Sequence, residues 1–475
     1  MSPTRRTATA LLAPTLALTL AACSGTAPKD STPSPSSPSS TSTSTSASPS
    51  PDATTAAVVD IPQTPVGIQV QWTLDALVPE ASVDPADAES RLTPAALAQL
   101  DGAALAAAFA SIAPTGPWEP IAYEGDDSQA MVQLRDSTGE RLDLTVVLSA
   151  DGLIEQLHFA PGFEHTAATS WDELETAVAA LPAETNLVVT DVSDPASPRE
   201  IVAVGQDSAF PVGSIFKLYV LGAVTDAVAE GTLAWDDVLV VTDDVKSLPS
   251  GLLQDAPDGT EITVQEAALQ MISISDNTAT DMLIDAVGRD AVQDQLAVMG
   301  HSDPDLNIPF LTTRELFLLG WADGGANRAG WAAADASTRD QILADLPAGR
   351  PQVAVTDVVE PVWQDGIDWF ASPTDLVAAQ VALQEKAKTE AGAPLAEILG
   401  TNAGIVPELA ATFDSLAFKG GSSMGVFALS WYVSGEHGDH VVTLQARTEN
   451  TADIGDARAY FASAQDALAL ISEGK

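Results

Sequence analysis

The sequence predicts a multidomain α+β protein, in which a small α+β domain precedes a larger domain built on one antiparallel sheet between helical layers. Three observations predict it. Residues 24–58 are almost entirely Ser, Thr, Pro and Ala, and residues 118–159 alternate apolar with polar side chains in four short runs. From about Thr169 the pattern becomes helix, two strands, a long helical middle, three strands and a terminal helix. The length of 475 residues also exceeds that of one compact core.

Composition excludes several function classes. The chain has 66 acidic and 20 basic side chains, a formal net charge of −46, so a polyanionic nucleic acid would be repelled. An apolar content of 45% excludes a wholly disordered chain. A single cysteine allows neither a disulfide framework nor a thiolate metal cluster. The histidines lack metal-ligand spacing with carboxylate partners, so we expect no metal and no other cofactor; they are His158, His165, His301, His437 and His440.

The N-terminus is typical of an export signal. Arg5 and Arg6 precede a short apolar stretch that ends in Leu-Ala-Ala before Cys23, too short for a spanning helix, so residues 1–22 are predicted to be a signal peptide. This ending resembles a bacterial lipobox, which implies that Cys23 carries the lipid and anchors the protein outside the cell at the cell membrane as a lipoprotein. The alternative is an ordinary signal peptide with an incidental cysteine. Residues 23–58 have no hydrophobic period and are expected to form a disordered, extended tether.

Residues 59–163 form the predicted small domain. Helical spacing covers Gln69–Leu77 and Thr93–Ile112. Four alternating strands follow, at Trp118–Glu124, Ala130–Arg135, Arg141–Leu148 and Leu153–Phe159. This order is similar to a cystatin-like or nuclear-transport-factor-like (NTF2-like) cone. No cluster of ionisable residues marks a site here, so a spacer or docking role is favoured.

Residues 166–475 form the predicted larger domain. A helix over Ser170–Leu181 opens it, and a helix over Ala457–Glu473 closes it. The strands between them are expected at Asn186–Asp191, Glu200–Val204, Leu416–Lys419, Val426–Ser434 and Asp439–Ala446.

The first motif with chemical meaning is Ser214-Ile-Phe-Lys217, at the head of a helix predicted over Ile215–Val224. Residues i and i+3 share a helix face, and a desolvated neutral lysine can take the proton of a serine hydroxyl. The helix N-terminus also directs backbone N–H groups towards any oxyanion formed there. The alternative is a capping serine with a solvated lysine, since Ser472 and Lys475 show the same spacing in the tail.

Two further motifs follow along the chain. In Ser275-Asp-Asn277, a serine can relay a proton to a leaving nitrogen and an asparagine can bind a substrate carbonyl, although these residues also favour helix starts. In Lys419-Gly-Gly421-Ser422, glycines allow a substrate backbone to approach the strand and the lysine supplies a fixed positive charge. The alternative for this segment is a plain strand with a glycine turn.

The three motifs in this order resemble the signature set of the penicillin-recognising serine hydrolases. The flanking residues of Phe210–Lys217 and Ser273–Ala279 resemble class A β-lactamases, over roughly residues 170–475. The chain is similar to a lipoprotein branch with a small cystatin-like N-terminal domain. The resemblance implies a serine hydrolase that forms an acyl-enzyme with β-lactams or small esters.

The resemblance also implies a role for each motif residue. Ser214 would be the acylated nucleophile, and Lys217 its general base or a proton relay. Ser275 would pass a proton to the leaving nitrogen. The substrate would be bound by Asn277, Lys419, Gly421 and Ser422, with the backbone N–H groups of Ser214 and Ser422 as the oxyanion hole.

Two departures from the family pattern predict a weak activity, and the first of them predicts slow deacylation. The family has a glutamate after Ser-Asp-Asn that activates the deacylating water, whereas here Asp303-Pro-Asp-Leu-Asn307 is the nearest match, in an interval up to Thr312 that suggests a truncated loop. Asp303 is the candidate base, and a surface turn is the alternative. Gly420 also stands where the family has a hydroxyl residue. One hydrogen bond to a substrate carboxylate is therefore lost, unless Ser422 or Ser423 supplies it. Two other functions stay open: a cell-wall DD-peptidase, and a non-enzymatic lipoprotein that binds β-lactams or cell-wall material.

Overall fold

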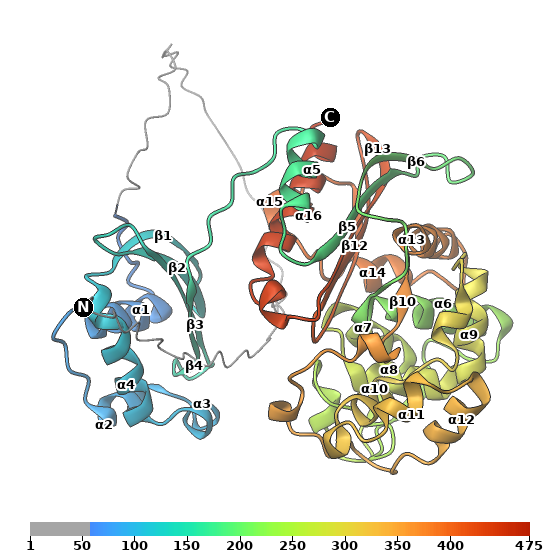
Figure 1. The fold of residues 1–475 in the computed structure, drawn as a ribbon, viewed down its shortest axis with the longest axis horizontal. Coiled ribbons are helices and arrows are strands. Elements are labelled where there is room, and N and C mark those ends of the chain that lie inside the picture. The colour runs from blue at the N-terminus through green and yellow to red at the C-terminus, as the bar shows by residue number, and fades with distance from the viewer. Residues whose placement is uncertain (1–57) are drawn as a thin grey trace, which may run out of the picture. The chain divides into compact units, whose positions relative to one another are not determined.

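The computed structural model describes residues 58–475, so the predicted signal peptide, Cys23 and almost all of the tether lie outside the described residues. The described chain divides into two compact units between His165 and Thr166 (Figure 1). Within the described part, no helix combines the length and the apolar character needed to cross a membrane.

The smaller unit packs helices on a four-stranded antiparallel meander. Its sheet has the order β1-β2-β3-β4, with β1 at Glu119–Gly125, β2 at Gln129–Arg135, β3 at Arg141–Leu148 and β4 at Ile154–Pro161. Its helices are α1 (Pro65–Ala76), α2 (Pro85–Arg91), α3 (Pro94–Gln99) and α4 (Gly102–Ile112). The single helix expected over residues 93–112 is two helices, because the Asp101 carboxylate accepts a hydrogen bond from Ala104 N (2.7 Å) and starts α4.

The larger unit contains one five-stranded antiparallel sheet in the order β11-β12-β13-β5-β6. The strands are β5 (Glu184–Asp191), β6 (Arg199–Val204), β11 (Ser415–Ser423), β12 (Val426–Gly435) and β13 (Gly438–Arg447). All five predicted strands are confirmed. The strand predicted at β11 ends too early, at Lys419, because Gly420 and Gly421 interrupt the apolar and polar alternation. In the structure these two glycines continue the ladder, opposite Leu429 and Ala428.

Helices cover both faces of this sheet, as predicted (Figure 1). On one face, α5 (Trp171–Ala179) and α16 (Arg458–Ser472) bury Leu174 and Leu468 against Trp431 of β12, which is fully buried. On the other face, Val377 of α13 (Pro373–Ala387) packs on Val441 of β13, and α6 (Lys217–Glu230) packs against α13. Burial of each large apolar side chain contributes about 2 kcal/mol to the stability of this arrangement.

The long middle of the chain forms a helical subdomain. It contains α7 (Val264–Ser273), α8 (Asn277–Val287), α9 (Arg289–Val298), α10 (Thr313–Gly320), α11 (Arg328–Ala332), α12 (Ala336–Ala344) and α14 (Leu395–Gly400). The short helix α15 (Pro407–Ala410) instead packs beside α16 (Figure 1). Two ladders complete the subdomain: β8 (Val238–Val240) with β9 (Glu261–Thr263), and β7 (Phe210–Pro211) with β10 (Phe370–Ala371). The β7–β10 ladder fixes the chain immediately before Ser214.

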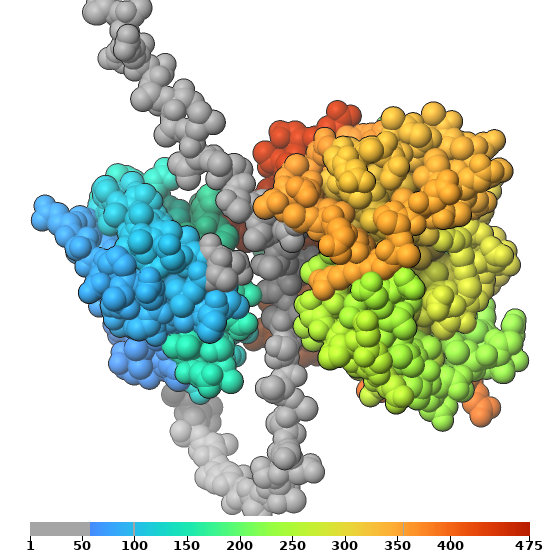
Figure 2. Space-filling view, turned by 90° about the horizontal axis from the view of Figure 1, so that it is seen from below, coloured from blue at the N-terminus to red at the C-terminus, as the bar shows by residue number. Residues whose placement is uncertain are grey.

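Two distant segments meet on the surface of this subdomain. Gly349 N donates to the Asp244 carboxylate (3.0 Å), and the Arg350 guanidinium lies 3.3 Å from the Asp255 carboxylate. Figure 2 shows these segments on one face, the first in orange and the second in green. The loop that joins β8 to β9 is therefore bonded to the segment that contains Gly349 and Arg350.

Candidate active site

Ser214 lies in a 3-10 turn, η2 (Gly213–Phe216), which leads directly into α6. The turn packs so closely against β11 that a glycine is needed on each side of the contact, Gly213 in the turn and Gly421 in the strand. A Cβ placed on Gly213 would lie 2.7 Å from Ser422 N, and one on Gly421 would lie 2.0 Å from Val212 O and 2.9 Å from Ser214 N. Gly213 also has φ of +49°, which favours glycine. This close approach brings the backbone amides of Ser214 and Ser422 side by side.

The side chains of Ser214 and Lys217 differ in environment. The Ser214 hydroxyl is partly exposed and has no hydrogen-bond partner among the described residues. The Lys217 side chain is fully buried, and its Nζ donates to Ser275 O (2.6 Å), Ser275 Oγ (3.1 Å) and Asn277 Oδ1 (2.7 Å). The lysine is thus fixed in one orientation, one helical turn from a free hydroxyl.

Ser275 lies between two lysines. Its Oγ accepts a hydrogen bond from Lys419 Nζ at 3.0 Å as well as from Lys217, and Lys419 Nζ also donates to Gly420 O (2.6 Å). Ser275 has φ of +58°, a conformation that costs a non-glycine residue about 1 kcal/mol. The Ser250 hydroxyl, which donates to Ser275 O (2.7 Å), helps to hold that conformation. Ser275 Oγ is therefore placed to exchange protons with either amine.

The buried lysines have altered protonation. Burial lowers the pKa of Lys217 to about 7, against the opposing effect of the Asp276 and Asp281 carboxylates. The pKa of Lys419 lies well below its usual value, first because of burial and then because of the charge on Lys217. Lys419 has no carboxylate partner among the described residues, so its surroundings disfavour the positive charge that the sequence predicts there. A bound substrate carboxylate would favour that charge.

Two buried carboxylates hold the Ser-Asp-Asn turn. Asp276 caps α8 through Ala279 N (2.8 Å) and also accepts from Leu252 N (2.6 Å). Asp281 accepts from Thr313 N and Arg314 N, both at 2.8 Å, and burial raises its pKa to about 7. Asn277 is also used internally, because its Nδ2 donates to Leu248 O (3.0 Å) while its Oδ1 accepts from Lys217. These contacts set the position of Lys217 before any substrate binds.

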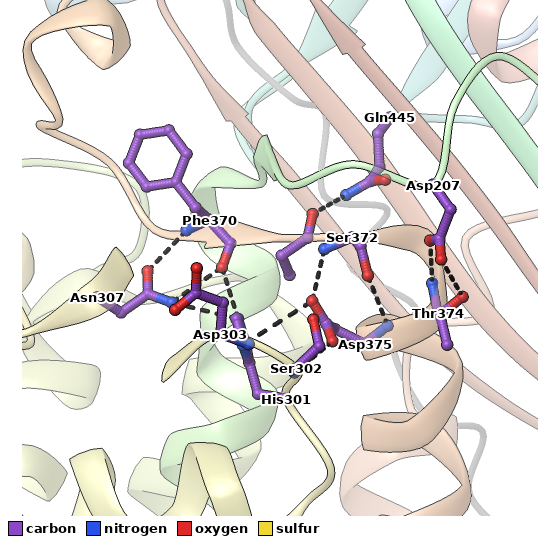
Figure 3. Close-up of polar contacts among 11 residues, drawn as sticks. Asp207, His301, Ser302, Asp303, Asn307, Phe370, Ser372, Thr374, Asp375 and Gln445 are labelled. Atoms are coloured by element: carbon purple, nitrogen blue, oxygen red, sulfur yellow. Dashed lines mark hydrogen bonds and ion pairs between the residues drawn. The ribbon is translucent and has the colours of Figure 1, made fainter. Parts of the chain in front are cut away.

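The segment with the candidate deacylation base is tied to β10 (Figure 3). Asn307 Nδ2 donates to Phe370 O (2.9 Å), and Asn307 Oδ1 accepts from Phe370 N (2.7 Å). His301 Nε2 lies 2.8 Å from the same carbonyl oxygen. The Asp303 side chain is exposed, and within residues 58–475 its carboxylate makes no hydrogen bond or ion pair. The side chain of Asn307 is thus committed to the backbone of β10.

The interval from Asp303 to Thr312 is short in the structure, as the sequence suggests. It holds the 3-10 turn η4 (Pro304–Asn307) and five further residues before α10 begins at Thr313. A much longer segment, which includes α10, α11 and α12, then returns the chain to β10. The return segment ends at Asp368, a fully buried carboxylate that sequence analysis did not select.

The structure therefore brings together most of the predicted site residues. Lys217, Ser275, Asn277 and Lys419 form one hydrogen-bonded group, and Gly421 and Ser422 lie against the turn that carries Ser214. Asp303 is not bonded to this group. Of the two hydroxyls considered as replacements at Gly420, Ser423 is already bonded to Asp368 (2.7 Å), whereas Ser422 has no side-chain partner among the described residues.

Comparison with known families agrees with this fold. Residues 169–339 match the model of the β-lactamase enzyme family. The larger unit, with its antiparallel sheet between helical layers, thus has a β-lactamase-like fold of the penicillin-recognising kind, and the predicted resemblance is confirmed at that level. Residues 61–154 match the model described as the N-terminal domain of the ORF 12 gene product. No curated protein matches the chain.

Several solved structures are similar to this chain. A β-lactamase from Sphaerobacter thermophilus has 23% identity and a TM-score of 0.43, over 64% of this chain and 98% of the other. PBP-A has 19% identity and a TM-score of 0.43, over 64% and 94%. A class A β-lactamase representative from Bacteroides cellulosilyticus has 18% identity and a TM-score of 0.44, over 64% and 96%.

Proposed function

We propose that the larger unit is a serine acyl-hydrolase that forms an acyl-enzyme at Ser214 with β-lactams or small esters. The observation that carries the proposal is the hydrogen-bonded group in which Ser275 Oγ accepts from both Lys217 and Lys419, with the Ser214 hydroxyl one helical turn before Lys217 at the head of α6. Mass spectrometry of the intact protein after mixing with such compounds tests it, because an acyl-enzyme adds the mass of the acyl group.

Acylation follows from the geometry. Neutral Lys217 accepts the Ser214 proton as Ser214 Oγ bonds to the carbonyl carbon. The negative charge on the carbonyl oxygen is stabilised by the N–H groups of Ser214 and Ser422, which lie side by side. The hydrogen bond from Lys217 to Ser275 then carries a proton onward, and Ser275 Oγ gives its own proton to the leaving nitrogen as the C–N bond breaks.

Substrate binding follows from charge. A carboxylate next to Lys419 would hold that amine protonated and accept hydrogen bonds from it and from the Ser422 hydroxyl. A protonated Lys419 is valuable in a chain with a net charge of −46, which otherwise repels anions. The carboxylate of a β-lactam matches this chemistry.

Deacylation is proposed to be slow. Hydrolysis of the ester needs a base that holds a water beside the acyl carbonyl. Asp303 remains the candidate from sequence, but its exposed carboxylate has no hydrogen bond to the described residues, and Asn307 is bonded at both ends to Phe370. The feature that supports slow deacylation is thus that, in this segment, Asn307 is not available to hold the water together with Asp303.

We expect burst kinetics. One equivalent of product should appear rapidly and a slow steady state should follow, with activated esters turned over faster than penicillins, because an ester leaving group needs no proton from Ser275. Rapid-mixing absorbance measurements with a chromogenic ester and a chromogenic β-lactam give both phases. Penicillin turnover without a burst, at the rate of an efficient β-lactamase, would contradict slow deacylation. Loss of such turnover in Asp303→Asn would then identify Asp303 as the base.

We also propose that Cys23, outside the described residues, anchors the protein to the outer face of the cell membrane. The Cys23→Ser variant should appear in the soluble fraction outside the cell or remain unprocessed, because it removes the only cysteine. Membrane fractionation with an antibody to the larger unit measures this. If the variant stayed in the membrane fraction in wild-type amounts, the lipid anchor would be elsewhere or absent.

A further inference from the structure

Asp368 is a buried carboxylate for which the chemistry above has no use. Its side chain is 3% exposed, at the end of the segment that returns to β10. One oxygen accepts hydrogen bonds from Gly213 N (2.9 Å) and from its neighbour Trp369 N (2.8 Å). The other oxygen accepts from Ser423 Oγ (2.7 Å). One carboxylate thus joins the residue before Ser214 to the residue after Ser422.

These two neighbours matter because Ser214 N and Ser422 N are the oxyanion donors of the proposed mechanism. The turn and β11 touch through glycines, with a Cβ on Gly213 meeting Ser422 N at 2.7 Å. Contact alone prevents closer approach but does not prevent separation. The hydrogen bonds from Gly213 N and Ser423 Oγ to Asp368 prevent separation, because they link the turn and the strand through one rigid planar group.

We propose that Asp368 is a positioning residue for the oxyanion hole, whose carboxylate holds the Ser214 and Ser422 amides at a fixed separation. The proposal rests on the proposed acyl-hydrolase function. Burial raises the pKa of Asp368 to about 6, with no charged side chain among the causes, so the group is mostly ionised at neutral pH and can accept all three hydrogen bonds. Removing it leaves Gly213 N–H without its partner and frees Ser423.

Four variants test this role. Asp368→Ala should lower the acylation rate constant by about 10- to 100-fold, since a shift of one donor weakens transition-state stabilisation. Asp368→Asn should stay within about threefold, because its carbonyl still accepts from Gly213 N and the Ser423 hydroxyl can turn to accept from the amide. Ser423→Ala should give an intermediate loss, and Ser423→Thr, which keeps the hydroxyl, should retain the wild-type rate.

The readout is chosen to separate positioning from general destabilisation. For each variant, a chromogenic activated ester gives the acylation rate constant and the pre-acylation affinity, and phenylboronic acid gives the affinity for a tetrahedral adduct of Ser214. The end-point adduct mass gives the active fraction. Positioning predicts that boronate affinity and acylation rate fall by the same factor while pre-acylation affinity changes less than about threefold.

Several results would overturn the inference. Wild-type acylation and boronate binding in Asp368→Ala or in Ser423→Ala would do so, as would a loss in Asp368→Ala accounted for by a lower active fraction alone. Equal losses of pre-acylation affinity and acylation rate would also contradict it. If the wild-type protein itself formed no adduct with the ester, the proposed function would fail together with this inference, whereas the outcomes above leave that function intact.

Discussion

The Ser214→Ala variant should form no covalent adduct with any β-lactam or activated ester, and its hydrolytic rate should fall by at least about 10³-fold. Among the described residues, Ser214 is the hydroxyl that combines a helix head, adjacent amides on β11 and a buried lysine one turn away. Intact-mass spectrometry over time measures the loss directly. Because the change only removes Oγ from a partly exposed side chain, the fold should be retained.

Ser472→Ala is the matched control for this variant. Ser472 also stands three residues before a lysine, Lys475, but it lies at the end of α16 with its hydroxyl bonded to Ala469 O (2.8 Å). The control should acylate at the wild-type rate. Retention of the adduct in Ser214→Ala, or its loss in Ser472→Ala, would show that the nucleophile has been assigned to the wrong serine.

The Lys217→Met variant should acylate about 10²- to 10⁴-fold more slowly than the wild type, the range expected when a general base is lost. Methionine approximates the length of lysine in a fully buried position but cannot accept the Ser214 proton or bond to Ser275. The pH profile gives a second signature. Because the pKa of Lys217 is about 7, it is protonated and inactive as a base below pH 7, so the acylation rate should rise as pH rises through about 7 and then level off.

That rising limb should be absent from the residual rate of Lys217→Met. Lys388→Met is the control, since Lys388 is an exposed lysine paired with Glu385 at the end of α13. It should keep both the rate and the pH profile. A wild-type profile that is flat between pH 6 and pH 8, or a Lys217→Met variant as fast as the wild type, would mean that another group takes the proton.

The sequence predicts the parts of the site that depend on neighbours in the chain. The spacing of Ser214 and Lys217 places them on one face of a helix, and each of the three motifs predicts the turn, helix start or strand on which it lies. Features that depend on distant partners could not be predicted. Asp368 bonds to Gly213 across 155 residues, with no motif at either end to suggest the contact.

Burial also changes chemistry in ways that a motif does not show. Lys419 was expected to supply a fixed positive charge, and the folded chain encloses it beside Lys217 and lowers its pKa. In the match at Asp303–Asn307, the sequence likewise does not show that the Asn307 side chain bonds to the backbone of β10. Residue type suggests a role, and the partners in the folded chain decide whether that role is available.

The central claim is that Ser214 becomes acylated and releases its acyl group slowly. Time-resolved intact-mass spectrometry of the wild-type protein, mixed in turn with a panel of β-lactams and activated esters and followed by peptide mapping, tests it most directly. The account predicts one equivalent of adduct, located on the peptide that contains Ser214, which forms rapidly and decays much more slowly than it forms. An adduct that never decays would instead favour the binding lipoprotein. No adduct across the panel, or an adduct on another residue, would contradict the claim.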